Sequence, residues 1–262
     1  PTKIGVVGAG KFDIQDITIM TVQTAIRSLG EKYEKYDEDD ETDDSIDVNK
    51  SEDIRKLITS AKLIICDEVQ HWAAKTCQVI ADHSCEARYR FGLSATPWRD
   101  TGDDILIDAC FGKPIIDINA SFLIKEGVLV KPSIYFVPVK SNITGTYQTV
   151  YSEGIVKNEQ RNTLIANIAK QMVKNGRQIL ILVKFIEHGN LLESMIPESF
   201  FVHGSHTANQ RQEWINKMRN RNAPVTIATS IFDEGVDVKP LDGLILAGSG
   251  KSQTRALQRI GR

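Results

Sequence analysis

The sequence has 262 residues, a length that suits one large or two medium-sized domains. A hydrophobic share of 41% and a charged share of 25% are typical of a globular protein and exclude a wholly disordered chain. The apolar runs are well short of the roughly 18 residues that a membrane-spanning helix needs, and the opening residues do not form a secretory signal pattern. We therefore expect an intracellular protein without a membrane partner.

The charge is unevenly distributed along the chain. Residues 1–130 carry 15 basic and 24 acidic residues, whereas residues 131–262 carry 17 basic and 10 acidic residues. Most of the acidic excess lies in residues 37–53, which hold ten Asp or Glu residues and one Lys. Such a run repels itself, so we expect a solvated, mobile loop there, with a metal or partner role as the alternative. The basic second half fits an anionic partner such as nucleic acid.

Short apolar segments alternate with helical patterns along the chain. Segments that are β-rich and bounded by turn-forming residues predict strands at 17–22, 63–66, 89–93, 179–183, 200–202, 225–227 and 243–246. Helical periodicity predicts helices at 51–60, 74–83, 161–174, 186–195 and 209–220. Almost continuously apolar strands that alternate with helices predict parallel sheets covered on both faces.

The alternation is interrupted between residues 119 and 149, where the sequence is extended and turn-rich and contains Pro132, Pro138 and Gly145. We place a connector at residues 119–149, between a first domain at residues 1–118 and a second domain at residues 150–262. The four cysteines show no CxxC spacing and are too few for a disulfide scaffold. We expect reduced thiols, mostly in the core, and no zinc site.

Residues 5–12 nearly match the phosphate-binding pattern GxxxxGK[ST]. Phe12 stands where the hydroxyl of a Ser or Thr would ligate magnesium, and it cannot do so. A phosphate loop also opens a helix, whereas Lys11 and Phe12 precede the β-rich segment at residues 17–22. We therefore expect a glycine turn between two strands here, and not a nucleotide site.

The segment at residues 63–71 is more informative, because an apolar strand ends in Asp67 and Glu68, with Gln70 close behind. Open α/β sheets place ligands at the carboxyl ends of their strands. Adjacent carboxylates at that position suit the binding of magnesium and the orientation of an attacking water. A pair of acids after a strand also commonly begins a helix, so the interpretation depends on further segments. These are GLSATPWR at residues 92–99, IATSIFDEGVD at residues 227–237 and QRIGR at residues 258–262.

These four segments, in this order and spacing, resemble the motifs of superfamily 2 helicases and translocases of the DEAD/DEAH type. The resemblance assigns motif II to residues 67–70, motif III to 94–96, motif V to 229–237 and motif VI to 258–262. Weaker matches are motif Ib at residues 17–24, motif IV at 178–183 with His188, and a backbone-contacting segment at 201–204. Within the superfamily, the sequence most resembles the DNA helicases of excision repair and the branch-migration helicases of large phages.

The resemblance implies an α/β fold of two RecA-like domains, with a nucleotide cleft between them. It implies an ATP-dependent DNA helicase or double-strand DNA translocase that uses ATP and Mg²⁺, in DNA repair or recombination. The implied location is the cytoplasm of a prokaryotic or phage-infected cell rather than a nucleus. Three alternatives stay open: the motor portion of a restriction enzyme subunit, an RNA helicase, or an inactive nucleic-acid-binding module.

The sequence departs from the family pattern in three places. Motif I, with its phosphate-binding Lys, belongs upstream of Pro1, and motif VI usually continues past Arg262 to a second arginine. We therefore expect a chain truncated before motif I and within motif VI, and negligible ATP hydrolysis by this chain alone. Gln70 stands where many relatives carry His, so a hydrogen bond to motif III can survive while a titratable contact is lost.

Individual roles also follow from the resemblance. The implied catalytic residues are Asp67, which also holds Mg²⁺, Glu68, Gln70, Gln258, Arg259 and the arginine finger Arg262. The implied nucleotide contacts are Ser94, Thr96, Gly235 and Asp237. The implied nucleic-acid contacts, whose small or polar groups meet phosphates without reading bases, are Thr21, Gln23, Gly204, Thr229 and Ser230. Ser94 and Thr96 could alternatively form a strand cap or turn, and the two arginines a basic helix end.

Overall fold

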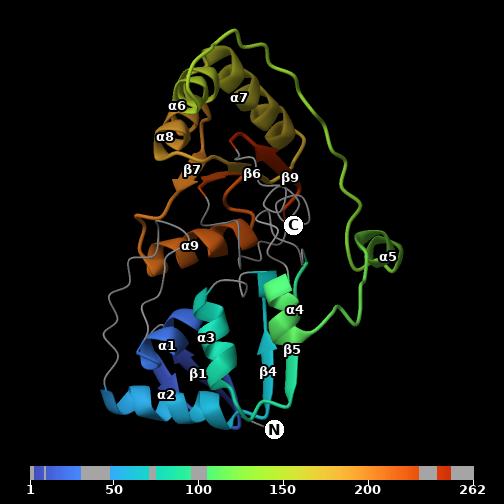
Figure 1. Cartoon of the computed structure of the whole chain (residues 1–262). Helices are drawn as coiled ribbons and strands as arrows, with labels where there is room; N and C mark the ends of the chain where they lie inside the picture. Colours follow the sequence, from blue (N-terminus) through green and yellow to red (C-terminus); the bar gives the residue numbers. More distant parts are fainter. Residues whose placement is uncertain are drawn as a thin grey trace. The chain divides into compact units, whose positions relative to one another are not determined.

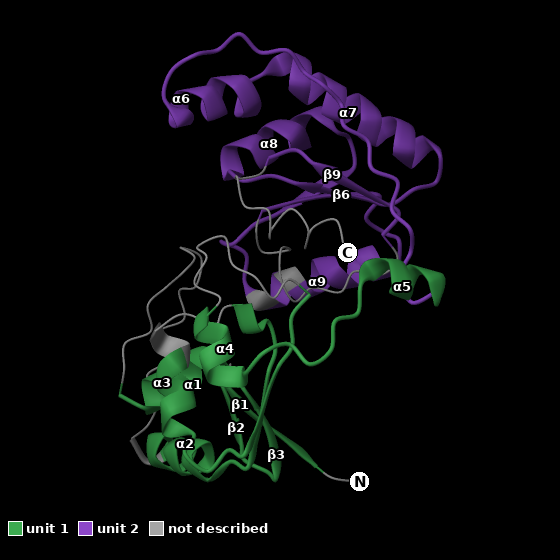
Figure 2. Ribbon diagram, turned by 45° about the vertical axis from the view of Figure 1, so that its right-hand side comes forward, with its two compact units in different colours: residues 1–126 green, residues 127–262 purple. Residues whose placement is uncertain are grey.

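The computed structural model describes residues 3–8, 10–30, 48–70, 75–95, 105–229 and 241–248. The chain divides into two compact units, residues 1–126 and residues 127–262 (Figures 1 and 2). Both units are α/β, and each is described by itself. Within these described residues, none of the helices has the length and apolar character needed to cross a membrane.

Unit 1 opens with a small sheet in which β1 (Ile4–Gly8) lies between β2 (Lys11–Asp13) and β3 (Ile17–Met20). β1 pairs antiparallel with β2 and parallel with β3. Gly8 and Gly10 have φ values of +127° and +76°, a region that side chains other than glycine rarely adopt. The expected glycine turn between two strands is confirmed, and Lys11 lies in a strand instead of at the start of a helix.

A second pair of strands in unit 1 carries the acidic segment singled out above. β4 (Leu63–Cys66) pairs parallel with β5 (Tyr89–Gly92), and the predicted bounds of both strands are confirmed to within one residue. The described helices of this unit are α1 (Val22–Ser28), α2 (Val48–Ser60), α3 (Lys75–His83), α4 (Ile105–Phe111) and α5 (Ala120–Lys125). The sequence did not predict α1, α4 and α5, which are only six or seven residues long.

The core of unit 1 lies between its strands and helices α1 to α3 (Figure 1). Ile26 and Ile54 are fully buried there, next to Val7 and Cys66 from the strands. Alternate apolar residues of β3, β4 and β5 point the other way, and Ile65 is 60% exposed. The strands are therefore apolar on both sides, as parallel strands commonly are, and the described helices cover one of them.

The prediction of a mobile acidic loop over residues 37–53 is wrong for its last part, because α2 begins at Val48. Ile54 and Ile58, four residues apart, form an apolar stripe that packs into the core and holds this segment helical. An exposed ion pair between Glu52 and Lys56, at 2.9 Å, joins successive turns of the same helix. Residues 31–47 lie outside the described part of the chain.

Unit 2 begins with residues 127–146, which contain neither helix nor strand. The helix α6 (Tyr147–Tyr151) continues into a π-helical turn, η2 (Ser152–Val156), and α7 (Glu159–Lys174) follows. Asn158 begins α7, since its side chain accepts a hydrogen bond from the N–H of Arg161 at 2.9 Å. The predicted start of this helix at residue 161 is therefore two residues late.

In the described part of unit 2, the sheet has four parallel strands in the order β7-β8-β6-β9. Its strands and helices in chain order are β6 (Ile179–Leu182), α8 (Ile186–Met195), β7 (Ser199–Val202), α9 (Ala208–Arg219), β8 (Val225–Ala228) and β9 (Gly243–Leu246). Ile179 and Ile181 pack toward α7 and α8, and Leu180 and Leu182 pack toward α9 (Figure 1). In this unit the predicted parallel sheet with both faces covered is confirmed.

Candidate functional site

The segments carrying Asp67 and Ser94 are packed together at the carboxyl ends of β4 and β5. The N–H of Leu93 donates to the carbonyl of Cys66 at 2.8 Å, and the N–H of Val69 donates to the carbonyl of Leu93 at 2.9 Å. A Cβ on Gly92 would lie 2.6 Å from Cγ2 of Val69, so only glycine lets the loop after β4 lie directly against β5. The two candidate motifs therefore form one structural unit.

The backbone turns sharply at Glu68, whose φ of +48° is uncommon for a residue other than glycine. The N–H of Glu68 donates to Oδ1 of Asp67 at 2.9 Å, which fixes the first carboxylate against the turn. Asp67 is exposed and Glu68 is half-buried. An unusual backbone conformation of this kind costs free energy and persists only where the surrounding structure stabilises it. Such conformations are common at functional sites.

A chain of hydrogen bonds joins the second carboxylate to the end of β5. The Oγ of Ser94 donates to Oε1 of Gln70 at 2.5 Å, and Nε2 of Gln70 donates to Oε2 of Glu68 at 2.7 Å. Gln70 is only 3% exposed, so its amide must satisfy both of its ends within the protein. The hydrogen bond expected between Gln70 and motif III is present. The bond from Gln70 to Glu68 was not predicted, because it depends on the turn at Glu68.

A magnesium ion that is shared with nucleotide phosphates needs fewer protein ligands than a metal ion held by the protein alone. Among the described residues, no group of three or more His, Cys, Asp and Glu side chains could hold a metal ion. Mg²⁺ in phosphate-transfer sites is bound by one or two carboxylates together with substrate phosphates and waters. A single exposed carboxylate such as Asp67 fits that requirement.

Two of the candidate nucleic-acid contacts lie at the start of α1. Thr21 is the N-cap of this helix: its Oγ1 accepts from the N–H of Thr24 at 3.4 Å and donates to Oγ1 of Thr24 at 2.8 Å. Capping by itself explains a threonine at this position. Thr21 is nevertheless exposed, while Gln23 is half-buried in the first turn of α1.

Two further candidates lie on neighbouring strand ends of the unit 2 sheet. Gly204 follows β7, in a turn where Nδ1 of His206 lies 3.2 Å from both the backbone N and the carbonyl O of His203. Thr229 follows β8, and its N–H donates to the carbonyl of Val202 at 3.3 Å. Thr229 is 6% exposed, and its Oγ1 is buried without a hydrogen-bond partner among the described residues. The structure thus brings Gly204 and Thr229 to one edge of the sheet.

The histidine of motif IV is a buried structural residue. Nε2 of His188 lies 3.0 Å from Oδ1 of Asn162, and Nδ2 of Asn162 donates to the carbonyl of Val156 at 2.7 Å. Burial and, secondarily, the nearby Arg161 lower the pKa of His188 to about 4. The neutral imidazole therefore links α8 to α7 and η2. Asn162 was not singled out from the sequence, since its partner is 26 residues away.

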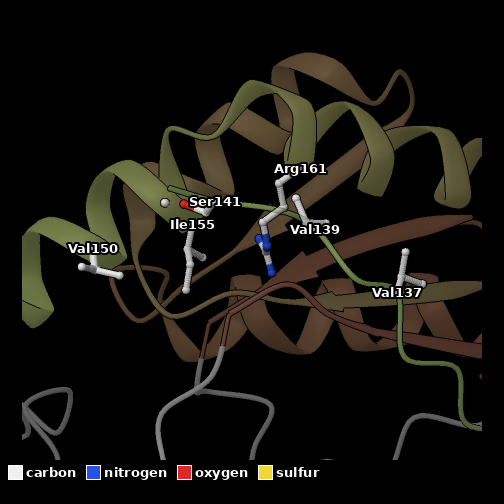
Figure 3. A pocket seen from close by; sticks show the side chains of 7 residues that line it. Val137, Val139, Ser141, Val150, Ile155 and Arg161 are labelled. Carbon is white, nitrogen blue, oxygen red and sulfur yellow. The ribbon is translucent and has the colours of Figure 1, made fainter. Parts of the chain in front are cut away.

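A cavity of about 270 Å³ opens in unit 2 beside α6 and η2 (Figure 3). Its lining exposes both apolar and polar groups and consists of Val137, Val139, Ser141, Val150, Gly154, Ile155 and Arg161. Burial lowers the pKa of Arg161, whose Nη1 has no hydrogen-bond partner among the described residues. None of the candidate site residues lines this cavity, so it is separate from the motifs.

The remaining candidates lie outside the described residues, and their roles stay predictions. They are Thr96, Ser230, Gly235, Asp237, Gln258, Arg259 and Arg262. The nucleotide cleft expected between the two domains likewise stays a prediction. The described candidate residues are therefore Thr21, Gln23, Asp67, Glu68, Gln70 and Ser94 in unit 1, and, separately, Gly204 and Thr229 in unit 2.

Comparison with known proteins connects these residues to protein families. Residues 3–99 match the family described as type III restriction enzyme, res subunit, and residues 151–262 match the helicase conserved C-terminal domain. Putative helicase 22 of a Sulfolobus islandicus filamentous virus is 27% identical over 236 residues, or 82% of this chain and 42% of that protein. The putative DNA 3'-5' helicase Rad25 of Haloarcula marismortui is 26% identical over 220 residues, or 79% of this chain and 34% of that protein.

The chain thus spans well under half the length of these curated relatives. Among solved structures, the Mycobacterium smegmatis helicase Lhr bound to ssDNA and AMP-PNP has a TM-score of 0.59 at 17% identity, covering 100% of this chain and 33% of that one. The S. cerevisiae protein Dbp5 bound to RNA and ADP BeF3 has a TM-score of 0.59 at 14% identity, covering 99% of this chain and 60% of that one. These likenesses show the RecA-like fold of a helicase core. By its two family matches, at residues 3–99 and 151–262, the chain belongs to the superfamily 2 helicases.

Proposed function

We propose that the full-length protein is an ATP-dependent DNA helicase or double-strand DNA translocase, which couples ATP hydrolysis to movement along DNA. The observation that carries the proposal is the hydrogen-bonded chain Glu68–Gln70–Ser94 at the carboxyl ends of two parallel strands. Open α/β sheets bind ligands at such strand ends. A catalytic carboxylate held by an amide, which is held in turn by a hydroxyl on the next strand, fits a site that senses and hydrolyses nucleotide.

Each described residue has a distinct task in this proposal. Asp67, which is exposed, holds Mg²⁺ together with the nucleotide phosphates, and the ion supplies neutralisation of phosphate charge. Glu68 orients the attacking water, and Gln70 fixes the direction of the Glu68 carboxylate. Ser94 connects this arrangement to β5. By the family pattern, the site is completed by Thr96, Gly235, Asp237, Gln258, Arg259 and Arg262.

The relatives favour DNA over RNA as the nucleic-acid partner. The relatives named as DNA helicases match most of this chain, including the ATP-dependent DNA helicase uvsW of phage T4 over 76%. The relatives named as rRNA helicases match 48% of it. Thr21, Gln23, Gly204, Thr229 and Ser230 are the proposed contacts to the nucleic-acid backbone. The viral and archaeal relatives fit a protein that works inside prokaryotic or virus-infected cells, in DNA repair or recombination.

A second candidate function is the motor portion of a restriction enzyme. It is favoured by the match of residues 3–99 to the type III restriction enzyme family. In that case the same ATP-driven translocation would feed DNA to a nuclease carried elsewhere. Incubation of the full-length protein with ATP and unmodified plasmid DNA separates the two: sequence-dependent cleavage supports the restriction enzyme, and strand separation without cleavage supports the helicase.

The proposal predicts that Glu68→Gln in the full-length protein abolishes ATP turnover while ATP and DNA binding are retained. Gln keeps the size and the polar contact of Glu68 but cannot act as a base, so hydrolysis at saturating DNA should fall by about 10² or more. Steady-state ATPase measurement is the test. Lys11→Ala is the matched control, because Lys11 lies in β2 and should leave turnover unchanged.

Turnover by Glu68→Gln within about threefold of the unmutated protein would refute the catalytic assignment, since a lost catalytic base costs far more. A strong loss of turnover in Lys11→Ala would instead place the nucleotide site at the glycine turn after β1. Binding of nucleotide and DNA, measured separately on each variant, distinguishes a catalytic defect from a folding defect.

A further inference from the structure

An aromatic cluster surrounds Lys184 at the carboxyl end of β6. The ring centroid of Tyr151 lies 5.2 Å from that of Phe185, edge to face, and 5.8 Å from that of Tyr147. Nζ of Lys184 lies 5.3 Å to 5.5 Å from the centroids of all three rings. The cluster joins α6 to the segment before α8, and the two helices lie near each other in Figures 1 and 2. Tyr147, Tyr151, Lys184 and Phe185 are called the aromatic platform below.

The platform has a buried base and an exposed top. Tyr151 is 3% exposed and anchors the cluster, whereas Phe185 is 44% exposed and Tyr147 is 53% exposed. A Cβ on Gly248, just after β9, would lie 2.6 Å from the hydroxyl of Tyr151, so glycine there leaves room for the anchor. Isolated exposed aromatic residues need no explanation, but two that share one buried anchor and one cation form an organised surface.

The platform lies on the sheet edge that already carries the candidate nucleic-acid contacts. β6 is the direct neighbour of β8, and β8 is the neighbour of β7. Lys184, Thr229 and Gly204 therefore follow three adjacent parallel strands. Lys184 is exposed, and the surrounding half of the chain carries 17 basic and 10 acidic residues. Basic charge beside exposed rings is the combination with which proteins bind single strands of nucleic acid.

We infer that the aromatic platform binds an unpaired base of single-stranded nucleic acid, by stacking on Phe185 and Tyr147. Lys184 neutralises a phosphate of the same strand, while Thr229 and Gly204 lie along the backbone. The inference rests on the proposed function for the nature of the ligand and adds a preference for single strands. The faces of paired bases are covered by their neighbours in a duplex, so the platform acts only where the strands are separated.

The experiment compares Phe185→Leu and Tyr147→Leu with the unmutated full-length protein. The probes are a dye-labelled thymidine oligonucleotide and the same oligonucleotide with abasic sites at its centre, and fluorescence anisotropy measures affinity without ATP. Stacking is worth about 1–3 kcal/mol per base, so each variant should bind the thymidine probe about tenfold more weakly. The unmutated protein should bind the abasic probe more weakly than the thymidine probe by a similar factor. Phe185→Leu, which already lacks the ring, should bind the two probes with nearly equal affinity.

The salt dependence of binding distinguishes base stacking on Phe185 from phosphate binding by Lys184. Phe185→Leu should leave the slope of log affinity against log salt unchanged, whereas Lys184→Gln should reduce it by about one phosphate contact. Phe136→Leu is the matched control, because Phe136 is an exposed phenylalanine of the same unit, outside the platform. Phe136→Leu should change neither the affinity for the thymidine probe nor the salt slope. Thermal unfolding of each variant shows that the fold is retained.

Two results would overturn the inference. One is equal affinity of the unmutated protein for the thymidine and abasic probes, and the other is a loss in Phe136→Leu as large as that in Phe185→Leu. Neither result bears on ATP hydrolysis, because binding is measured without ATP. Conversely, Glu68→Gln tests hydrolysis without altering the platform, so the two assignments fail independently.

Discussion

At the scale of single residues, Gln70 and His188 are buried polar side chains that are held by hydrogen bonds. Gln70 accepts from Ser94 and donates to Glu68, which uses both ends of its amide. Nε2 of His188 is bonded to Asn162, whose own amide donates to the carbonyl of Val156. The acceptor at Oδ1 of Asn162 implies that Nε2 of His188 carries a proton. Burial, which lowers the pKa of His188 to about 4, keeps the second proton off the ring, so the imidazole is neutral at neutral pH.

Protonation of His188 is therefore expected to destabilise unit 2. The pKa of His188 is lowered to about 4 in the folded state, below the ordinary value of 6.5, so the unfolded chain binds the proton more readily. The resulting stability is complete above about pH 6.5 and is lost as the pH falls toward about 4, at roughly 1.4 kcal/mol per pH unit. His188→Gln keeps an N–H donor for Asn162 and does not titrate.

Denaturant unfolding of both proteins from pH 7 to pH 4 measures this difference. The free energy of unfolding of the unmutated protein should fall more than that of His188→Gln, by on the order of 3 kcal/mol. Other titrating groups contribute equally to both proteins and cancel. Parallel pH profiles would contradict the assignment of a buried, neutral histidine.

At the scale of elements, close helix–strand contacts determine how α8 lies on the unit 2 sheet. Gly189 is buried in α8, and a Cβ there would lie 2.2 Å from the ring of Phe201 in β7. Glycine normally destabilises a helix interior by about 1 kcal/mol relative to alanine. Its presence in α8 is explained by this contact, since any side chain would force the helix away from the strand.

Gly189→Ala is therefore expected to destabilise unit 2, although alanine favours a helix. The clash with Phe201 should cost about 1–3 kcal/mol, typical of overpacking in a core. Asn190→Ala is the control: Asn190 is exposed on the same helix, so the substitution should be neutral or slightly stabilising. Thermal unfolding of both variants is the measurement. A stabilised Gly189→Ala would show that α8 can move away from β7 at little cost.

At the scale of the whole molecule, the acidic segment is the feature that departs most from an even charge distribution. Residues 37–53 hold ten acidic residues, yet the last of them belong to α2, which packs through Ile54 into the core of unit 1. The described candidate site residues of unit 1 lie elsewhere, at residues 21, 23, 67, 68, 70 and 94. The acidic residues before α2 can therefore be replaced without altering the proposed catalytic residues.

Replacing residues 37–46 by a short Gly/Ser linker in the full-length protein should leave DNA-stimulated ATPase activity within about twofold, since no proposed catalytic residue is removed. Extending the replacement through residue 53 is the informative comparison: it removes the first turns of α2 and should lower the thermal stability. A tenfold loss of activity in the shorter replacement, with the fold intact by circular dichroism, would assign a partner or autoinhibitory role to the acidic segment.

The sequence by itself determined the order of the motifs and the position of most of the longer strands and helices. Strands and long helices have local periodicities, so β4, β6, α8 and β9 were predicted to within one residue. Local chemistry also sufficed to reject the phosphate loop at residues 5–12, because Phe12 lacks a hydroxyl and glycines favour a turn. Short helices such as α4 and α5 were missed, because six or seven residues give too little periodicity.

Only the tertiary structure decided which distant residues meet. The strand order β7-β8-β6-β9 brings Lys184 beside Thr229, and no periodicity in the sequence specifies which strands are neighbours. The contact between Tyr151 and Phe185 and the bond from Ser94 to Gln70 depend on the same long-range packing. The start of α2 inside the acidic run was decided by the burial of Ile54, since packing of an apolar face outweighs local charge repulsion.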